Sequence, residues 1–398
     1  MAAGYELFIN TYSLAEDDTT ETIAEAAFLA GFTGRSRGNV RRRWRLTGEV
    51  GAGTELWRES LGGDIRWLDS LGNTRLRISG EGRGRQYRTD TAYGLSSDNL
   101  EGRLDVRGYP LATGRMKLES RAWMSGRDYR IPSTLELDRR EVGGGLAVSG
   151  GRTVRRAWSL GARFFRRTYP DSSGINRDTV SMIGSWDNSG GGDSQVRIYH
   201  RTDRRTVADE SARPSAWTHW TDLDFEQPVA AASLFLEMQN EVWRYDSVSQ
   251  AYRNSWRTSG RLGCSWGDVL GTRWRAGFSG ELLRNDDDTE SYDQYGVLGG
   301  METYGRRLTG SMLLEFGHRT YSASGDDELP LDPVSPGDGA FEAGPSDFNY
   351  WKIWLTANWS LTEHLALDLM ASYEPENHGE KTDDTTLGFA SVRLVWRP

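Results

Sequence analysis

The chain has 398 residues, of which 37% are hydrophobic and 26% are charged, and its formal net charge is −9 at pH 7. It contains no run of about 20 apolar residues, so membrane-spanning helices are excluded. The abundance of tryptophan and tyrosine argues against disorder. The one cysteine, Cys264, excludes a disulfide framework and a cysteine metal site. Nearly all basic residues are arginine, but they form no compact patch on a globular motif, so no nucleic-acid partner is expected.

The first 38 residues are the least regular part of the pattern. The opening MAAGYELFIN has no positively charged start followed by an apolar run, so no signal peptide is expected in this chain. Residues 5–13 alternate like a strand, whereas Thr22 and Glu25 have the spacing of a capping box before a run of helix formers. We therefore expect residues 1–38 to contribute one or two strands or a short helix, and residues 39–398 to form the main domain.

From residue 39 onward, apolar and polar residues alternate with a period of two. Trp57, Leu61, Ile65 and Trp67 share one face of such a segment, and charged or small residues occupy most of the other. At about 3.3 Å per residue and a tilt near 40°, the two tryptophans lie roughly 25 Å apart along a membrane normal, the height of the apolar band of a membrane-spanning barrel. Trp256 and Trp266 repeat this spacing.

Turn-forming residues separate the segments, and short and long connections alternate. Short turns are expected near 69–73, 109–114, 188–193, 227–231, 267–271, 304–307 and 361–364. Longer loops are expected near 89–97, 126–134, 169–178, 203–215, 245–253, 285–292, 322–347 and 374–386. Segments of about 10 to 15 residues are longer than the strands of most globular sheets, which argues against a soluble β-sandwich or propeller. The pattern predicts an all-β fold: a single closed antiparallel up-and-down transmembrane β-barrel of about 18 strands, within a range of 16 to 20.

The chain resembles the bacterial outer-membrane β-barrel class, which includes porins and export channels, over nearly all of its length. Its closing segment, Leu387–Trp396, looks like the terminal strand that these proteins present to their assembly machinery, although Arg397 and Pro398 follow the aromatic residue. No closer family is identified. The resemblance implies the outer membrane of a Gram-negative bacterium, with lipid around the barrel, short periplasmic turns and longer extracellular loops.

With the apolar face outward, the charged side chains line the interior and set its ion selectivity. The pore-lining residues predicted in the first half are Arg58, Arg66, Arg75, Arg77, Arg83, Arg85, Arg103, Arg107, Arg121, Arg163, Arg167, Arg197 and Arg201. Those predicted in the second half are Asp222, Glu237, Glu241, Arg257, Arg261, Arg275, Glu281 and Glu315. This distribution predicts a basic wall facing a more acidic one. The alternative interpretation is that these groups pair with one another and satisfy a filled interior.

Tryptophans near the ends of the segments are predicted to lie at the two membrane interfaces. They are Trp57, Trp67, Trp158, Trp256, Trp266, Trp274, Trp351, Trp359 and Trp396.

These features favour a porin-like channel for small polar or anionic solutes. Similarity to alginate-type export pores leaves open an export pore for an anionic polysaccharide. A structural or sheath barrel that binds a protein partner in its lumen or at its periplasmic rim also stays open. An enzyme is not expected, because His200 and His219 share faces with Ile198 and Leu223 and no nucleophile elbow or metal pair accompanies them. No cofactor or metal is expected, and the acidic loop 322–347 matches no calcium cage.

Overall fold

The computed structural model describes residues 2–396 except 15–18, 36–41, 54–55, 69–72, 88–98, 113–115, 130–136, 154–155, 190–193, 249–251, 269, 287–290, 323–346 and 379–384. The described residues form twenty strands and one short helix, η1 (Ser173–Ile175). The strands are β1 (Ala2–Leu14), β2 (Thr19–Arg35), β3 (Arg42–Gly53), β4 (Leu56–Leu68), β5 (Thr74–Tyr87), β6 (Asn99–Ala112), β7 (Met116–Tyr129), β8 (Arg139–Thr153), β9 (Arg156–Thr168), β10 (Arg177–Ser189), β11 (Gln195–Val207), β12 (Ala216–Val229), β13 (Ala232–Tyr245), β14 (Ser255–Gly267), β15 (Thr272–Asn285), β16 (Tyr292–Tyr304), β17 (Leu308–Tyr321), β18 (Phe348–Ser360), β19 (Leu365–His378) and β20 (Thr385–Trp396). No helix in this part of the chain is long and apolar enough to cross a membrane.

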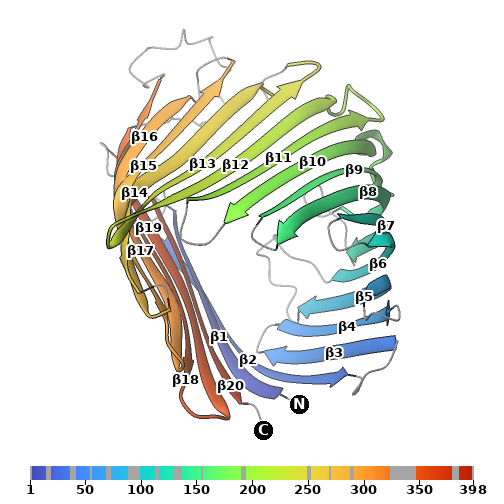
Figure 1. Ribbon diagram of the computed structural model, residues 1–398, viewed down its shortest axis with the longest axis horizontal. Coiled ribbons are helices and arrows are strands. Elements are labelled where there is room, and N and C mark those ends of the chain that lie inside the picture. Colours follow the sequence, from blue (N-terminus) through green and yellow to red (C-terminus); the bar gives the residue numbers. More distant parts are fainter. Residues whose placement is uncertain are drawn as a thin grey trace.

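Each strand pairs antiparallel with the strand that follows it, and β1 pairs with β20, so the sheet closes on itself (Figure 1). The register at the closing seam places Leu7 opposite Val392 and Ile9 opposite Ala390. The prediction of a closed up-and-down antiparallel barrel is confirmed. The strand number, twenty within the described residues, lies at the upper end of the predicted range because β1 and β2 are both strands. The short helix considered for residues 22–32 does not form.

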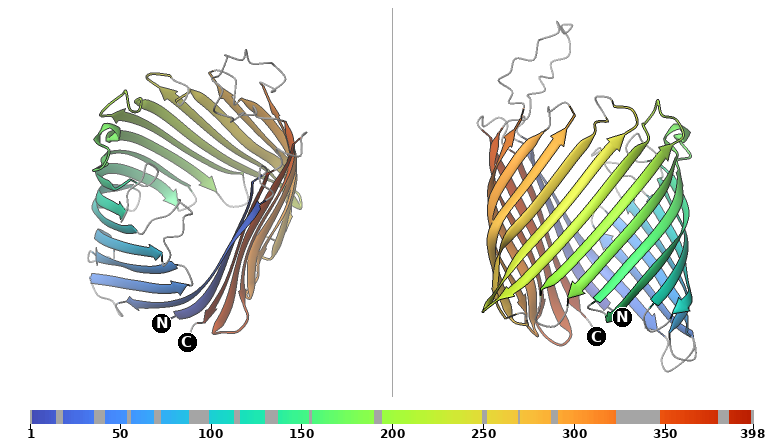
Figure 2. Two further views of the ribbon diagram at one scale, coloured as in Figure 1. Left: turned by 180° about the vertical axis from the view of Figure 1, so that it is seen from behind. Right: turned by 45° about the horizontal axis from the view of Figure 1, so that its top comes forward.

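The strands are strongly tilted, and both chain ends lie at the same end of the barrel (Figure 2). At this end β12 and β13 are joined by residues 230–231, β16 and β17 by 305–307, and β18 and β19 by 361–364. At the opposite end, which we call the loop end, the connections include 169–176, 208–215 and 322–347. From β4 onward the predicted alternation of short turns and longer loops is therefore confirmed. It does not extend to β3, because the connection from β3 to β4 at the loop end, 54–55, is shorter than the connection from β2 to β3 at the other end, 36–41. Positive φ angles at Ala230 (55°) and Gly267 (105°) allow two of the short turns.

Ion pairs between strands that are not neighbours identify the inner face of the sheet. Arg261 of β14 lies 3.5 Å from Glu315 of β17, and Arg273 of β15 bonds to Glu226 of β12. Side chains from strands three apart can meet only on the concave side of a curved sheet, because on the convex side they diverge. The face that carries these residues is therefore the interior.

The outer face carries large apolar side chains that no other described residue covers. Leu61, Leu160 and Phe278 are 56%, 58% and 66% exposed. Similar exposed side chains occur on nearly every strand from β3 to β20. A water-soluble protein rarely exposes apolar area on this scale, because each Å² left in water costs about 25 cal/mol. Most large apolar side chains of this fold thus face outward, away from the interior of the barrel.

Candidate functional site

The register places the predicted charged residues on the inner face. Arg77 of β5 lies opposite Arg66 of β4 and Arg107 of β6, and Arg107 lies opposite Arg121 of β7. Farther along, Arg163 of β9 and Arg201 of β11 both flank β10 on the same face. Arg197 of β11 lies opposite Asp224 of β12. In the second half, Glu237 lies opposite Arg261 and Glu241 lies opposite Arg257. The same alternation holds for Arg83, Arg85, Arg103, Arg167, Asp222, Arg275, Glu281 and Glu315. Arg75 lies at a register irregularity between β4 and β5, so the pairing does not assign its face. The side chain of Arg58 lies outside the described residues.

Strands β3 to β7 form an arginine-rich recess of about 550 Å³ on the inner face. It is lined by Arg45, Arg77, Arg83, Arg103, Arg107 and Arg121 and by the carboxylates Asp64, Glu81 and Asp105. Asp105 accepts hydrogen bonds from Arg107 at 2.7 Å and from Arg121 at 2.6 Å. Arg103 lies 3.9 Å from the same carboxylate, near the upper limit for an ion pair, and its side chain is 52% exposed. Positive charge therefore exceeds negative charge along this wall.

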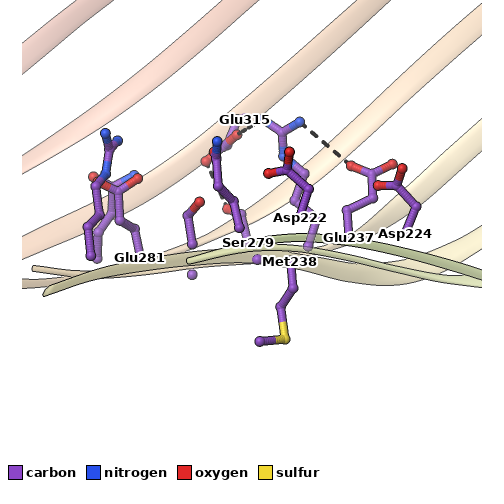
Figure 3. A pocket seen from close by; sticks show the side chains of 14 residues that line it. Asp222, Asp224, Glu237, Met238, Ser279, Glu281 and Glu315 are labelled. Atoms are coloured by element: carbon purple, nitrogen blue, oxygen red, sulfur yellow. Dashed lines mark hydrogen bonds and ion pairs between the residues drawn. The ribbon is translucent and has the colours of Figure 1, made fainter. Parts of the chain in front are cut away.

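Strands β12 to β17 form a second recess, of about 500 Å³, with more carboxylates (Figure 3). Asp222, Asp224, Glu237, Glu281 and Glu315 point to one side of the sheet, whereas Met238 points to the other (Figure 3). Glu237 lies 3.2 Å from Arg275 and 3.9 Å from Arg261. Asp224 is 3.6 Å from Arg197. In the described residues no cation lies within ion-pair distance of Asp222.

A buried hydrogen-bond network fixes part of this second wall. Glu315 accepts hydrogen bonds from Ser279 at 2.8 Å and from the Tyr350 hydroxyl at 2.9 Å. Gln294 donates to the Tyr350 hydroxyl at 2.8 Å, and Arg319 donates to Gln294 at 2.9 Å. Sequence reasoning missed Tyr350, Gln294 and Arg319, although their parity within β18, β16 and β17 places them on the charged face.

Pairing is therefore extensive but unequal around the barrel. The alternative interpretation, in which the charges neutralise one another, holds for single groups such as Asp105 and Glu141. Glu141 accepts hydrogen bonds from Arg167 at 2.7 and 3.0 Å. The interpretation does not hold for the net charge of each wall. Arginines outnumber carboxylates on the inner face of β3 to β11, and carboxylates outnumber cations on that of β12 to β20 among the described residues.

The predicted interface tryptophans lie on the outer face near strand ends. Trp158, Trp266, Trp274 and Trp359, all 41–48% exposed, lie toward the end that carries the termini. Trp67 lies at the same end. Trp57, Trp256 and Trp351 lie toward the loop end, and the side chain of Trp396 lies outside the described residues. Trp44, Trp186 and Trp217 share these outer positions. The prediction missed them although each lies on the apolar face of its segment.

The remaining candidate groups lie on the outer face. His200 contacts Thr221 at 2.9 Å, and His219 contacts Thr202 at 3.0 Å. Cys264 is exposed and is not in a disulfide. Among the described residues, no group of three or more His, Cys, Asp or Glu side chains could hold a metal ion.

No protein-family model and no curated protein matches the chain, but solved structures do. It is similar to the siderophore receptor PirA from Pseudomonas aeruginosa at 9% identity, over 99% of this chain and 80% of that one, with a TM-score of 0.55. It is similar to the copper transporter OprC at 10% identity over the same shares, with a TM-score of 0.55. It is similar to OccAB4 from Acinetobacter baumannii at 7% identity, over 99% and 96% of the two chains, with a TM-score of 0.50. At these identities the likeness concerns the fold, which is that of the outer-membrane β-barrel class.

Proposed function

We propose that this chain is an outer-membrane channel that passes small polar or anionic solutes. The observation that carries the proposal is the closed sheet with an apolar outer face and an ionic inner face. In this arrangement lipid covers the outer side chains, and the outer tryptophans lie at the two membrane–water interfaces. The end with the short turns and both termini faces the periplasm, and the loop end faces the cell exterior.

The width of the barrel supports a water-filled interior. Eight-stranded barrels are filled by their own side chains, whereas barrels of 16 to 18 strands leave an aqueous channel. A ring of twenty strands is wider still, and none of the strands described here lies inside it. Solutes of the size that porins pass therefore have room.

The excess of arginine on β3 to β11 favours anions over cations. Fixed charges on a low-dielectric wall attract counter-ions more strongly than the same charges in bulk water, because field lines are confined to the pore. The carboxylates of β12 to β20 oppose this preference on the other wall. We expect a moderate anion preference, and we assign the chain no enzymatic activity.

Planar bilayer recording tests the proposal. The purified folded chain should produce discrete conductance steps, and its reversal potential in a KCl gradient should show preference for chloride. Absence of conductance would overturn the channel proposal in favour of a barrel filled by a partner or a sheath. Cation preference would overturn the anion part alone.

Export of an anionic polysaccharide is the second candidate, supported by arginines on the inner face of the consecutive strands β3 to β7. A long polyanion can contact these side chains in series, whereas a small anion contacts one or two. A soluble polyuronate added to one side of the bilayer should then interrupt the current at micromolar concentration, and a neutral polysaccharide of equal length should not. Equal effects of the two polymers would reject this candidate.

A further inference from the structure

Three arginines of the inner wall and one in an adjoining connection gather at the loop end. Arg167 of β9 lies directly opposite Arg177 of β10. Arg205 of β11 is two residues from Val207, which lies opposite Arg177 on its other side. The guanidinium of Arg213, in the 208–215 connection, packs on Tyr252, which contacts Tyr245 and through it Trp243, the ring on which Arg205 packs. We call Arg167, Arg177, Arg205 and Arg213 the mouth cluster.

Few negative charges neutralise the mouth cluster. Glu141 pairs with Arg167 at 2.7 Å. Asp203 accepts a hydrogen bond from Arg201 at 2.8 Å, and Asp209 accepts from Ser211 at 2.6 Å. Within the part of the chain that the structure describes, no carboxylate lies within ion-pair distance of Arg177, Arg205 or Arg213.

Two of these guanidinium groups also have one buried nitrogen that finds no acceptor in the part of the chain that the structure describes. The Nε atoms of Arg177 and Arg213 are buried and donate to no protein acceptor in the described residues. An oxyanion held among the arginines would supply acceptors to the outer guanidinium nitrogens and offset the repulsion between like charges.

Aromatic rings hold the cluster in place. The guanidinium of Arg205 lies 5.2 Å from the ring centre of Trp243, and that of Arg213 lies 5.8 Å from the ring centre of Tyr252. Tyr245 contacts both rings, at 6.2 Å from Trp243 and 5.5 Å from Tyr252. Trp243 also donates its indole N–H to the carboxylate of Glu241 at 2.6 Å.

The backbone around the cluster is preorganised as well. The amide N–H of Ala208 donates to the carbonyl of Asn176 at 2.8 Å, and that of Asp209 donates to the carbonyl of Gly174 at 3.1 Å. These bonds tie the connection between β9 and β10 to the one between β11 and β12. Arg205 and Trp243 also line a recess of about 380 Å³ beside the cluster. The carboxylates of Asp203 and Glu241 line the same recess, but Asp203 is bonded to Arg201 and Glu241 to the indole of Trp243. A preorganised site loses little entropy on binding.

We propose that the mouth cluster binds a small organic or inorganic polyanion with two or more carboxylate or phosphate groups. Arginine suits this role because its planar fork donates two parallel hydrogen bonds to one oxyanion. A monovalent anion can satisfy one guanidinium, whereas a polyanion can bridge several. The site's place at the mouth of a channel rests on the proposed function, but binding itself does not.

Isothermal titration calorimetry of the folded chain in detergent tests the site, with citrate and tripolyphosphate as probes and acetate as the monovalent comparison. At least one of the two polyanions should bind, and acetate should bind far more weakly. Arg177→Gln and Arg213→Gln should each weaken binding roughly tenfold or more, since each removes a charge-assisted hydrogen bond. The preferred probe decides between carboxylate and phosphate ligands.

Outer-face neighbours provide matched controls. Arg166 and Arg204 adjoin cluster members in sequence but pair on the outer face with Asp178 and Asp246. Arg166→Gln and Arg204→Gln should therefore leave the affinity unchanged. Binding of neither probe, or equal loss in inner-face and outer-face variants, would overturn the proposal. If Arg177→Gln does not fold, Arg213→Gln in the connection still provides the test.

Channel recording keeps this proposal separate from the proposed function. Addition of the bound polyanion on the loop-end side should reduce the wild-type current, and Arg213→Gln should require a higher concentration for the same reduction. A chain that binds the polyanion but does not conduct would retain the site and reject the channel. A chain that conducts but binds neither probe would support the channel and reject the polyanion site.

Discussion

At the scale of single residues, large aromatic side chains on the inner wall lie across glycines of the adjacent strand. Tyr350 lies directly opposite Gly317, and Phe235 lies directly opposite Gly263. A Cβ atom on Gly317 would be 2.5 Å from Cζ of Tyr350, and one on Gly263 would be 2.8 Å from Cζ of Phe235. The rings therefore lie along the wall instead of projecting into the interior.

The contact between Gly317 and Tyr350 predicts the effect of one methyl group. Gly317→Ala should lower the free energy of unfolding by about 1–3 kcal/mol, because the ring must move and its hydroxyl must leave Glu315 and Gln294. Gly299→Ala, in the neighbouring strand β16, is the control, since a Cβ there meets nothing within 4 Å. Urea unfolding midpoints of the barrel in lipid vesicles measure the difference. Equal midpoints for the two variants would show that Tyr350 moves without cost.

Sequence alternation predicts the face of a residue but not its neighbour. Within β17 the period of two places Glu315 and Gly317 on one face, and that much is readable from the chain. Which residue of β18 lies opposite Gly317 depends on the register between the strands, and a shift by two residues would keep every face unchanged. For the same reason, the Glu315–Arg261 contact between β17 and β14 could not be predicted.

At the scale of elements, the N-terminal strands show where local propensity fails. Residues 22–32 contain helix formers, yet they form part of β2 between β1 and β3. A helix at this position would leave the edges of β1 and β3 unpaired. An open edge is very unfavourable in a bilayer, because no water is present to accept its hydrogen bonds. Closure is a requirement of the whole sheet, so propensities within one segment do not reveal it.

The seam between β1 and β20 provides a direct test of closure. In a background with Cys264→Ser, cysteines at Leu7 and Val392 should form a disulfide on oxidation, because residues directly opposite in an antiparallel pair lie within bonding distance. The pair Leu7→Cys with Ala390→Cys is the control, since Ala390 lies opposite Ile9. Electrophoretic mobility without reductant measures cross-linking. Faster cross-linking of the control pair would contradict this register.

At the scale of the whole molecule, the two walls differ in charge because the sequence changes sign between its halves. That asymmetry is visible in the sequence, since period-two alternation assigns most charged residues of the strands to the interior, with exceptions near strand ends such as Arg166 and Arg204. The sequence does not show how far neighbouring groups neutralise each charge. Asp105 is surrounded by Arg107 and Arg121 and is nearly neutralised, whereas Asp222 has no cation at ion-pair distance in the described residues. In the proposed channel, ion selectivity would depend on groups of the second kind, which only the structure distinguishes.

Weakly paired residues of the two walls should therefore shift selectivity in opposite directions. Arg77→Gln with Arg103→Gln should reduce the preference for chloride, because these arginines lie no closer than 3.7 and 3.9 Å to their carboxylates. Asp222→Asn with Asp224→Asn should increase it, since among the described residues Asp224 has one cation at ion-pair distance, Arg197 at 3.6 Å. Reversal potentials in a KCl gradient measure both shifts, which should diminish as salt screens the charges.

The outer-face pair Arg166 and Asp178 is the control for these variants. The charges of this pair lie on the far side of the wall from the ion path, so Arg166→Gln with Asp178→Asn should leave the reversal potential unchanged. A shift in the same direction for the inner variants of both walls would mean that the substitutions alter the shape of the pore. A shift for the outer-face variant as large as for the inner variants would place the ion path outside the barrel interior. Opposite shifts from the two inner walls, with none from the outer face, would identify fixed interior charge as the cause of selectivity.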